Sequence, residues 1–251
     1  MARRVPGGVL LAAAMLFGAT GGEARPPAVA GIEATYDFYL GGIWAGKLTL
    51  EAEFGAGTYH AGITARTAGI VGFFFKTGVE AETVGRIDAA GLSPERFSAD
   101  AYEPGHRQKV EISYQGGSPV AVVAEPAYRA RPWSISFAGQ PGIADPLSAA
   151  FEALAPAGPD AICNQTADIF DGERRWAIEI GPPHLEGGRE GGRIRCDANY
   201  VRIAGFKPTL MGKWARRPLA LFFEDRGDGL FHVVRVAGQT WLGLAVLLLR
   251  E

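Results

Sequence analysis

Apolar and polar residues alternate along much of the chain, which is the pattern of a half-buried β-strand. The first clear run covers residues 32–40, where the apolar positions are Ile32, Ala34, Tyr36, Phe38 and Leu40. The alternation resumes in residues 43–54, directly after Gly41-Gly42. A glycine pair between two such runs favours a tight turn, so the pattern predicts an antiparallel hairpin.

Further runs of this kind follow at short intervals and are separated by glycine and proline. The predicted strands are residues 32–40, 43–54, 58–67, 78–87, 95–103, 107–114, 120–124, 133–137, 165–170, 174–180, 194–203, 219–224, 230–236 and 240–249. Residues 181–192 are rich in glycine and charge and are expected to form a mobile loop. We predict an all-β fold, either a highly curved antiparallel sheet or an open β-barrel with one short helix.

One segment has helical spacing instead. Asp145 is a typical N-cap, and Pro146 suits the first position of a helix. The apolar positions that then share one helical face are Leu147, Ala150, Phe151 and Leu154. Pro156 ends the pattern. The sequence therefore predicts a short helix over residues 145–154 that covers one end of the sheet.

The first 24 residues have the composition of an export signal. Arg3 and Arg4 precede a short apolar run, and small residues lead to a cleavage site near Ala24. The apolar run is too short to span a bilayer as a helix. We expect residues 1–24 to be a signal peptide and residues 25–251 to be a single β-rich domain in the periplasm, without an integral membrane span.

The two cysteines, Cys163 and Cys196, are 33 residues apart. An exported protein with two cysteines usually joins them in a disulfide. A metal or redox pair is the weaker alternative, because there is no Cys-x-x-Cys spacing and no histidine lies close to either cysteine in the sequence. We predict a structural disulfide between them.

Charge and motifs exclude several functions. With 25 basic and 27 acidic side chains the net charge is −2, which disfavours a nucleic-acid partner. The sequence has no nucleophile elbow, zinc-protease motif or phosphate loop. We therefore predict no catalytic residue, no metal and no cofactor. Two pairs of carboxylates, Glu51 with Glu53 and Glu80 with Glu82, share a strand face and suit a glycan-acting hydrolase. Such a face is more often simply solvated.

Three consecutive phenylalanines, Phe73, Phe74 and Phe75, interrupt the alternation. They cannot all face the core from a strand, because successive side chains of a strand point to opposite sides. One interpretation is a loop or short helical turn tucked under the sheet. The other is an apolar lip at the mouth of a curved sheet, where it touches lipid or a partner.

Several segments occur together in one order. They are Gly41-Gly42-Ile43-Trp44-Ala45-Gly46, Thr67-Ala68-Gly69-Ile70-Val71-Gly72, Asp145-Pro146-Leu147-Ser148-Ala149, Ile169-Phe170-Asp171-Gly172-Glu173-Arg174-Arg175, and Cys196-Asp197-Ala198-Asn199-Tyr200 with Ile203-Ala204-Gly205-Phe206. With this order the chain resembles the exported bacterial family called domain of unknown function 3108, over roughly residues 34 to 249. The resemblance implies a periplasmic, β-rich protein and carries over no catalytic residue.

The leading hypothesis is a non-enzymatic envelope protein that binds a hydrophobic or amphipathic ligand, or a partner, in the concave face of its sheet. A lipid or another envelope protein is the expected partner. The candidate lining residues are Trp44, Phe73, Phe74, Phe75, Phe151 and Trp241. The alternatives are a structural envelope factor whose interior is filled by its own side chains and, less favoured, the glycan-acting hydrolase.

Overall fold

The computed structural model describes residues 30–55, 57–88, 91–186, 192–212, 215–240 and 242–250. The expected signal peptide, residues 1–24, lies outside the described residues. Within them the chain forms thirteen strands, two α-helices and a short 3-10 helix. The strands are β1 (Gly31–Leu40), β2 (Ile43–Gly55), β3 (Thr58–Thr67), β4 (Gly78–Asp88), β5 (Gly91–Glu103), β6 (His106–Gln115), β7 (Ser118–Glu125), β8 (Gln165–Phe170), β9 (Arg175–Glu186), β10 (Arg193–Ala204), β11 (Arg216–Asp225), β12 (Phe231–Thr240) and β13 (Gly243–Leu249). The helices are α1 (Gly69–Phe74), α2 (Pro146–Leu154) and the 3-10 helix Pro208–Leu210.

All thirteen strands belong to one antiparallel sheet, in the order β7-β6-β5-β4-β3-β2-β1-β13-β12-β11-β10-β9-β8. Consecutive strands pair with each other everywhere except between β7 and β8, and β1 also pairs with β13, so the first and last strands meet in the middle of the sheet. The two edges are β7 and β8, which leaves the sheet unclosed. This architecture confirms the predicted all-β fold with a curved antiparallel sheet.

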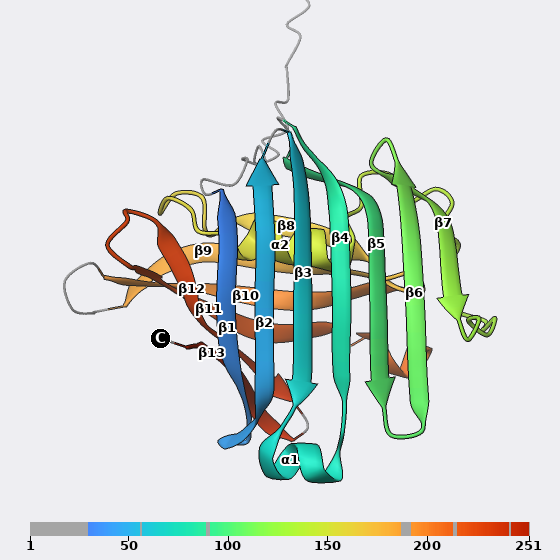
Figure 1. Ribbon diagram of the computed structural model, residues 1–251, viewed down its shortest axis with the longest axis horizontal. Helices are drawn as coiled ribbons and strands as arrows, with labels where there is room; N and C mark the ends of the chain where they lie inside the picture. Colours follow the sequence, from blue (N-terminus) through green and yellow to red (C-terminus); the bar gives the residue numbers. More distant parts are fainter. Residues whose placement is uncertain are drawn as a thin grey trace, which may run out of the picture.

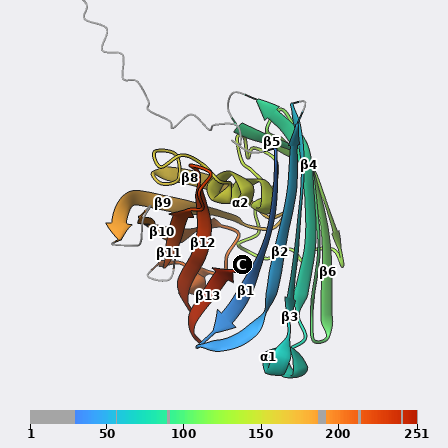
Figure 2. The ribbon, with the colours of Figure 1, turned by 60° about the vertical axis from the view of Figure 1, so that its left-hand side comes forward.

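The sheet bends back on itself, so that the half containing β1–β7 faces the half containing β8–β13 (Figures 1 and 2). In Figure 1 the strands of the first half run vertically, and β9 and β10 cross behind them at a steep angle. Helix α2 lies between the two halves. The molecule is therefore a sheet folded into two facing layers, with a helix filling part of the space between them.

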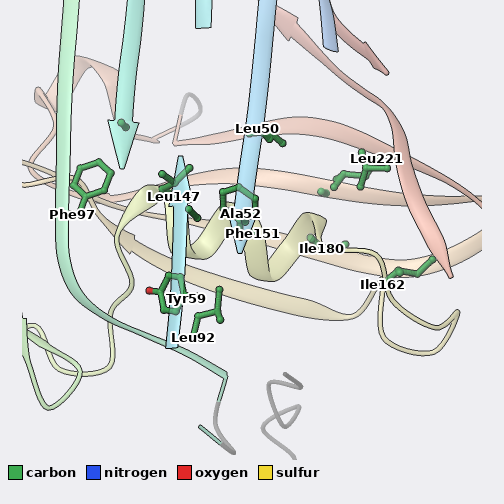
Figure 3. Close-up of a cluster of buried hydrophobic side chains, with 14 of the residues drawn as sticks. Leu50, Ala52, Tyr59, Leu92, Phe97, Leu147, Phe151, Ile162, Ile180 and Leu221 are labelled. Atoms are coloured by element: carbon green, nitrogen blue, oxygen red, sulfur yellow. The ribbon is translucent and has the colours of Figure 1, made fainter. Parts of the chain in front are cut away.

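The buried side chains come from the faces of the two layers that point inward (Figure 3). Leu50 and Ala52 of β2 are each 6% exposed, and Leu221 of β11 is 3% exposed. Leu147 and Phe151 of α2 pack between them, and the Phe151 ring meets the Phe54 ring edge-on at 6.5 Å. The alternation in the sequence thus identifies the inward face of each strand correctly.

Helix α2 begins as the sequence predicts. The Asp145 carboxylate accepts hydrogen bonds from the backbone N–H groups of Leu147 at 2.8 Å and Ser148 at 3.0 Å. Pro146 follows at the first helical position, where its missing N–H costs nothing. The helix contacts β3, β4, β5 and β8, so it closes one end of the space between the two layers.

The structure contains the predicted disulfide between Cys163 and Cys196, whose Cα atoms are 5.9 Å apart. Cys163 lies between α2 and β8, and Cys196 lies on the inward face of β10. Both are buried. The link therefore fastens the segment that follows α2 to the floor of the second layer.

For three segments the predicted secondary structure differs from the structure. Residues 133–137 form no strand, because Ile135 and Phe137 pack on the core from an irregular segment between the sheet edges. Of the predicted loop over 181–192, the part up to Glu186 is instead a continuation of β9, paired with β10, and residues 187–191 lie outside the described residues. The prolines of β9 are tolerated because β8 reaches only as far as Ile180, which leaves one side of β9 unpaired. The predicted strand over 240–249 is the end of β12, a turn and β13.

Candidate ligand-binding site

A cavity of about 540 Å³ lies between the two layers, at the end away from α2. Its walls are the inward-facing residues near the ends of β1–β4 and of β11–β13. The apolar lining residues are Phe38, Leu48, Ala65, Val79, Leu219, Val236, Ala245, Val246 and Leu247. No residue of α2 lines it. The space is thus a part of the interior that the helix does not fill.

Two alanines on the facing layers help to explain why this space is open. Ala65 of β3 lies between Leu48 and Val79 across the sheet, and Ala245 of β13 lies opposite Gly238 of β12, beside which Leu219 packs. At the other end of the same strands, β3 carries Tyr59, which reaches Ser148 of α2. Short side chains on both facing layers leave a gap that longer ones would close.

The polar residues that line the cavity come from its rim rather than its walls. They are Lys47, Arg66, Thr67, Thr77, Gln239 and Thr240, with Gly78 and Gly238 contributing only backbone. The Thr67 hydroxyl already donates to the carbonyl oxygens of Phe75 at 2.7 Å and Thr77 at 3.1 Å. An apolar interior with cations at its rim fits a molecule that has a hydrocarbon part and an anionic head.

The phenylalanine run forms a lip beside this rim. Helix α1 connects β3 to β4 beyond the ends of the strands (Figure 1). Phe73 is 83% exposed, Phe74 66% and Phe75 64%. The expectation of a short helical turn is confirmed, but the expectation that it is tucked under the sheet is wrong. The place against the sheet is taken by Trp44, so the phenylalanines point outward.

Trp44 anchors α1 on the outer side of the sheet. Its ring N–H donates to a carboxylate oxygen of Asp37 at 2.9 Å. The start of α1 rests on the ring, since a Cβ atom added to Gly69 would lie 2.9 Å from it. Gly69 also has a φ of +60°, a conformation that other residues rarely adopt. Trp44 is therefore placed to position the lip rather than to line the cavity.

The structure does not bring the six candidate residues together. Phe151 belongs to α2 and is 2% exposed in the core, at the closed end of the interior. Trp241 lies outside the described residues, and the other four lie at or behind the lip. The lining residues Phe38, Leu48 and Val79 were missed, although their signal is the inward register of the alternating strands.

The four carboxylates of the hydrolase alternative lie on the outer face of the sheet. Glu51, Glu53, Glu80 and Glu82 are all exposed, and Glu80 pairs with Arg66. They line a trough of about 790 Å³ that crosses the outer side of β2–β7. Their exposure fits the solvated-face interpretation, and their place in a trough is also the setting that the hydrolase alternative requires.

A buried polar network holds α2 against the first layer. Asp145 accepts from the Thr83 hydroxyl at 3.0 Å and from the Ser148 hydroxyl, which is also 2.6 Å from the Tyr59 hydroxyl. Burial raises the pKa of Asp145 above its usual range, and hydrogen bonds from Ser148, Leu147 and Thr83 oppose this effect. Asp145 and Ser148 are 0% exposed, so the network has no access for a substrate and its role is to fix the helix.

The described residues contain no group of three or more His, Cys, Asp or Glu side chains placed to hold a metal ion. Within the same ranges, no helix has both the length and the apolar character needed to cross a bilayer.

The fold and the cavity define a curved-sheet protein with an apolar interior space. The model of the family "Protein of unknown function (DUF3108)" matches residues 35–181, and the chain belongs to this family. The crystal structure of a β-barrel-like protein of the domain of unknown function DUF1849 from Brucella abortus is similar with a TM-score of 0.43 and 9% sequence identity, covering 87% of this chain and 95% of that one. The sequence matches no curated protein.

Proposed function

We propose that this protein is a periplasmic envelope protein that binds the hydrocarbon part of an amphipathic ligand in its interior cavity, without catalysing a reaction. The observation that carries the proposal is the cavity of about 540 Å³ with apolar walls. Its volume lies within the range of roughly 300–1,000 Å³ typical of small-molecule sites. Helix α2 fills the other end of the interior, and the cavity rim lies at the end that carries the lip, which is the proposed entry for a ligand.

The physical driving force is burial of hydrocarbon. Each methylene that leaves water for an apolar wall contributes about 0.8 kcal/mol. An aliphatic chain of lipid length therefore binds well without any specific hydrogen bond, while its head group remains at the rim. Exposed Lys47 at this rim favours an anionic head group over a cationic one, whereas Arg66 already pairs with Glu80.

The compartment is part of the same proposal. Residues 1–24 have the composition of a signal peptide, and residues 25–251 would form the exported domain. The disulfide between Cys163 and Cys196 supports this assignment, because such bonds persist in oxidising compartments such as the periplasm.

Lipid mass spectrometry of protein purified from its native periplasm tests the proposal. We expect an amphipathic molecule to co-purify with the wild type. We expect Ala65→Leu, which extends a side chain into the cavity, to reduce both the co-purified lipid and the uptake of a fluorescent fatty acid. Thr64→Leu is the matched control, because Thr64 is the adjacent residue of β3 and faces outward.

Two outcomes would overturn the proposal. An empty extract together with no fatty-acid uptake favours the structural envelope factor, whose interior serves only to hold the sheet together. Uptake that is lost in Thr64→Leu but kept in Ala65→Leu places the ligand in the outer trough instead of the interior.

A further inference from the structure

An apolar surface surrounds the mouth of the cavity. We call it the tip and define it by exposed residues of α1, the β1–β2 turn and the β12–β13 turn: Ile43, Ile70, Phe73, Phe74, Phe75 and Leu242. These segments are contiguous, because the Gly41 N–H donates to the Leu244 carbonyl at 2.9 Å and the Ala68 N–H donates to the Ala45 carbonyl at 2.9 Å. The tip is therefore one surface made from three parts of the chain.

The fold does not need these apolar side chains. Helix α1 has no buried residue, and every member of the tip is at least 50% exposed. A contiguous apolar patch on a folded protein marks a place of interaction, whereas scattered exposed apolar residues do not. The phenylalanines thus stabilise something other than the folded monomer.

The charges around the tip indicate the chemistry of its partner. Residues 41–47, 66–78 and 242–249 contain Lys47, Arg66 and Lys76, and they contain no aspartate or glutamate. Arg66 is paired with Glu80 of β4, so Lys47 and Lys76 carry the positive charge of the tip. Asp37, which lies opposite Lys47, is bound to Trp44 and Arg250. Lys76 is exposed and forms no ion pair with any described residue. The tip therefore combines an apolar centre with positive charge.

The outer face of β2–β7 has the opposite character. Seven carboxylates line its trough: Glu51, Glu53, Glu80, Glu82, Asp100, Glu111 and Glu125. Lys109 also lines it, Glu80 pairs with Arg66, and Asp100 pairs with Arg107, so the trough keeps a net negative charge. An anionic surface repels this face and attracts the tip, so the charge distribution favours docking by the tip. The β5–β6 turn, which carries Glu103, lies outside the tip.

We propose that the tip docks the protein on an anionic lipid bilayer. Phe73, Phe74 and Phe75 enter the boundary between head groups and acyl chains, as the apolar face of a surface-bound helix does, while Lys76 contacts the head groups. Because Thr67 and Thr77 belong both to the base of the α1 connection and to the cavity rim, docking sets the cavity mouth against the membrane. Docking does not depend on the cavity being occupied.

Vesicle flotation with the full mature chain tests this proposal. We expect binding to vesicles of phosphatidylglycerol mixed with phosphatidylethanolamine, and weaker binding to pure phosphatidylcholine. The triple change Phe73→Ser, Phe74→Ser and Phe75→Ser should weaken binding by roughly tenfold or more, because burial of even one phenylalanine is worth about that factor. Leu185→Ser is the matched control, since Leu185 is 83% exposed like Phe73 but lies on β9.

The charge component has its own variant. Lys76→Glu should weaken binding to the anionic vesicles severalfold and leave binding to phosphatidylcholine unchanged, because a lysine near an anionic surface contributes about 1 kcal/mol. Raising the salt to about 1 M, where the Debye length is about 3 Å, should remove the difference between Lys76→Glu and wild type. Circular dichroism confirms that each variant is folded.

The outcomes separate this proposal from the proposed function. Ala65→Leu should bind vesicles like wild type even though it takes up less fatty acid, so loss of one activity does not imply loss of the other. Equal vesicle binding by the wild type and the triple variant would overturn the docking proposal. A second outcome would also overturn it. If the wild type does not bind vesicles but self-associates in sedimentation, and the triple variant does not self-associate, the tip joins two copies of the chain instead.

Discussion

Asp145→Ala should destabilise the protein more than any surface substitution, because one buried carboxylate both caps α2 and joins it to the first layer. Its Oδ1 atom accepts from the N–H groups of Leu147 and Ser148, at 2.8 and 3.0 Å. Its Oδ2 atom accepts from the Thr83 hydroxyl at 3.0 Å and from the Ser148 hydroxyl. Alanine removes all four acceptor contacts and leaves the donors enclosed.

The size of the effect follows from these contacts. Loss of an N-cap costs about 1 kcal/mol, and a buried donor left without a partner costs about 1–3 kcal/mol. Thr83 and Ser148 are at most 1% exposed, so water does not replace the carboxylate easily. Removal of a carboxylate whose pKa is raised by burial returns part of this loss. We therefore expect a net loss of about 3–4 kcal/mol in the free energy of unfolding.

Urea unfolding followed by circular dichroism measures this loss. Asp145→Asn is the control, because asparagine caps helices about as well as aspartate and can still hydrogen-bond Ser148. It should retain at least half of the stability that alanine loses. If Asp145→Ala instead lies within about 0.5 kcal/mol of wild type, as surface substitutions do, the network does not hold α2 in place.

Three further predictions follow from the structure. Because burial raises the folded-state pKa of Asp145, its contribution to stability is present below the unfolded value of about 3.9 and is lost as the pH rises through the folded value. Urea unfolding from about pH 4 upward should therefore show a gain for Asp145→Asn relative to wild type as the pH rises, and a constant difference would refute this. Joint replacement of Cys163 and Cys196 by serine should lower the free energy of unfolding by about 3–4 kcal/mol, measured in urea, since the 33-residue separation sets the loop entropy. Trp44→Ala should accelerate amide hydrogen exchange in α1. Unchanged exchange would show that the stability of α1 does not depend on its contact with Trp44.

The sequence predicts most strands because alternation is a local property. Residues 48–54 illustrate this, since Leu48, Leu50, Ala52 and Phe54 all face the interior in β2. The bulge before Gly46 reverses the alternation, so Trp44 lies on the outer side. Alternation gives a wrong prediction where a segment has no neighbouring strand with which to pair. Residues 133–137 alternate as well, yet they lie between the two sheet edges, and no strand of the described sheet pairs with them. Alternation shows which side chains are buried together, but not which backbone is available to pair.

The candidate site was harder to predict, because it depends on contacts between distant parts of the chain. The cavity lies between β1–β4, which come first in the described chain, and β11–β13, which come last. The same two layers are joined by a hydrogen bond from the Tyr36 hydroxyl to the Val233 carbonyl, two residues that are 197 positions apart in the sequence. Whether Ala65 faces a packed neighbour or an open space depends on the layer opposite, which local periodicity does not contain. The three consecutive phenylalanines are evident in the sequence. The outward orientation of their side chains is not, because it follows from the position of Trp44 behind α1.

Ala65→Leu should raise the free energy of unfolding and lower ligand binding at the same time. If the cavity is empty in the ligand-free protein, the added methyl groups fill space between Leu48 and Val79, its neighbours across the sheet, and bury hydrocarbon without displacing a packed atom. Burial of the three added carbons at about 0.8 kcal/mol each then predicts a gain of about 2 kcal/mol in the free energy of unfolding, measured in urea. The same substitution should reduce fatty-acid uptake, because the leucine side chain occupies the space that the ligand needs. A gain in stability together with a loss of binding is the expected trade-off at a binding site. A structural factor with a self-filled interior predicts the reverse, since leucine would then overpack the core and destabilise it by about 1–3 kcal/mol. The sign of the change in the free energy of unfolding, measured on delipidated protein, therefore decides between a binding protein and a scaffold.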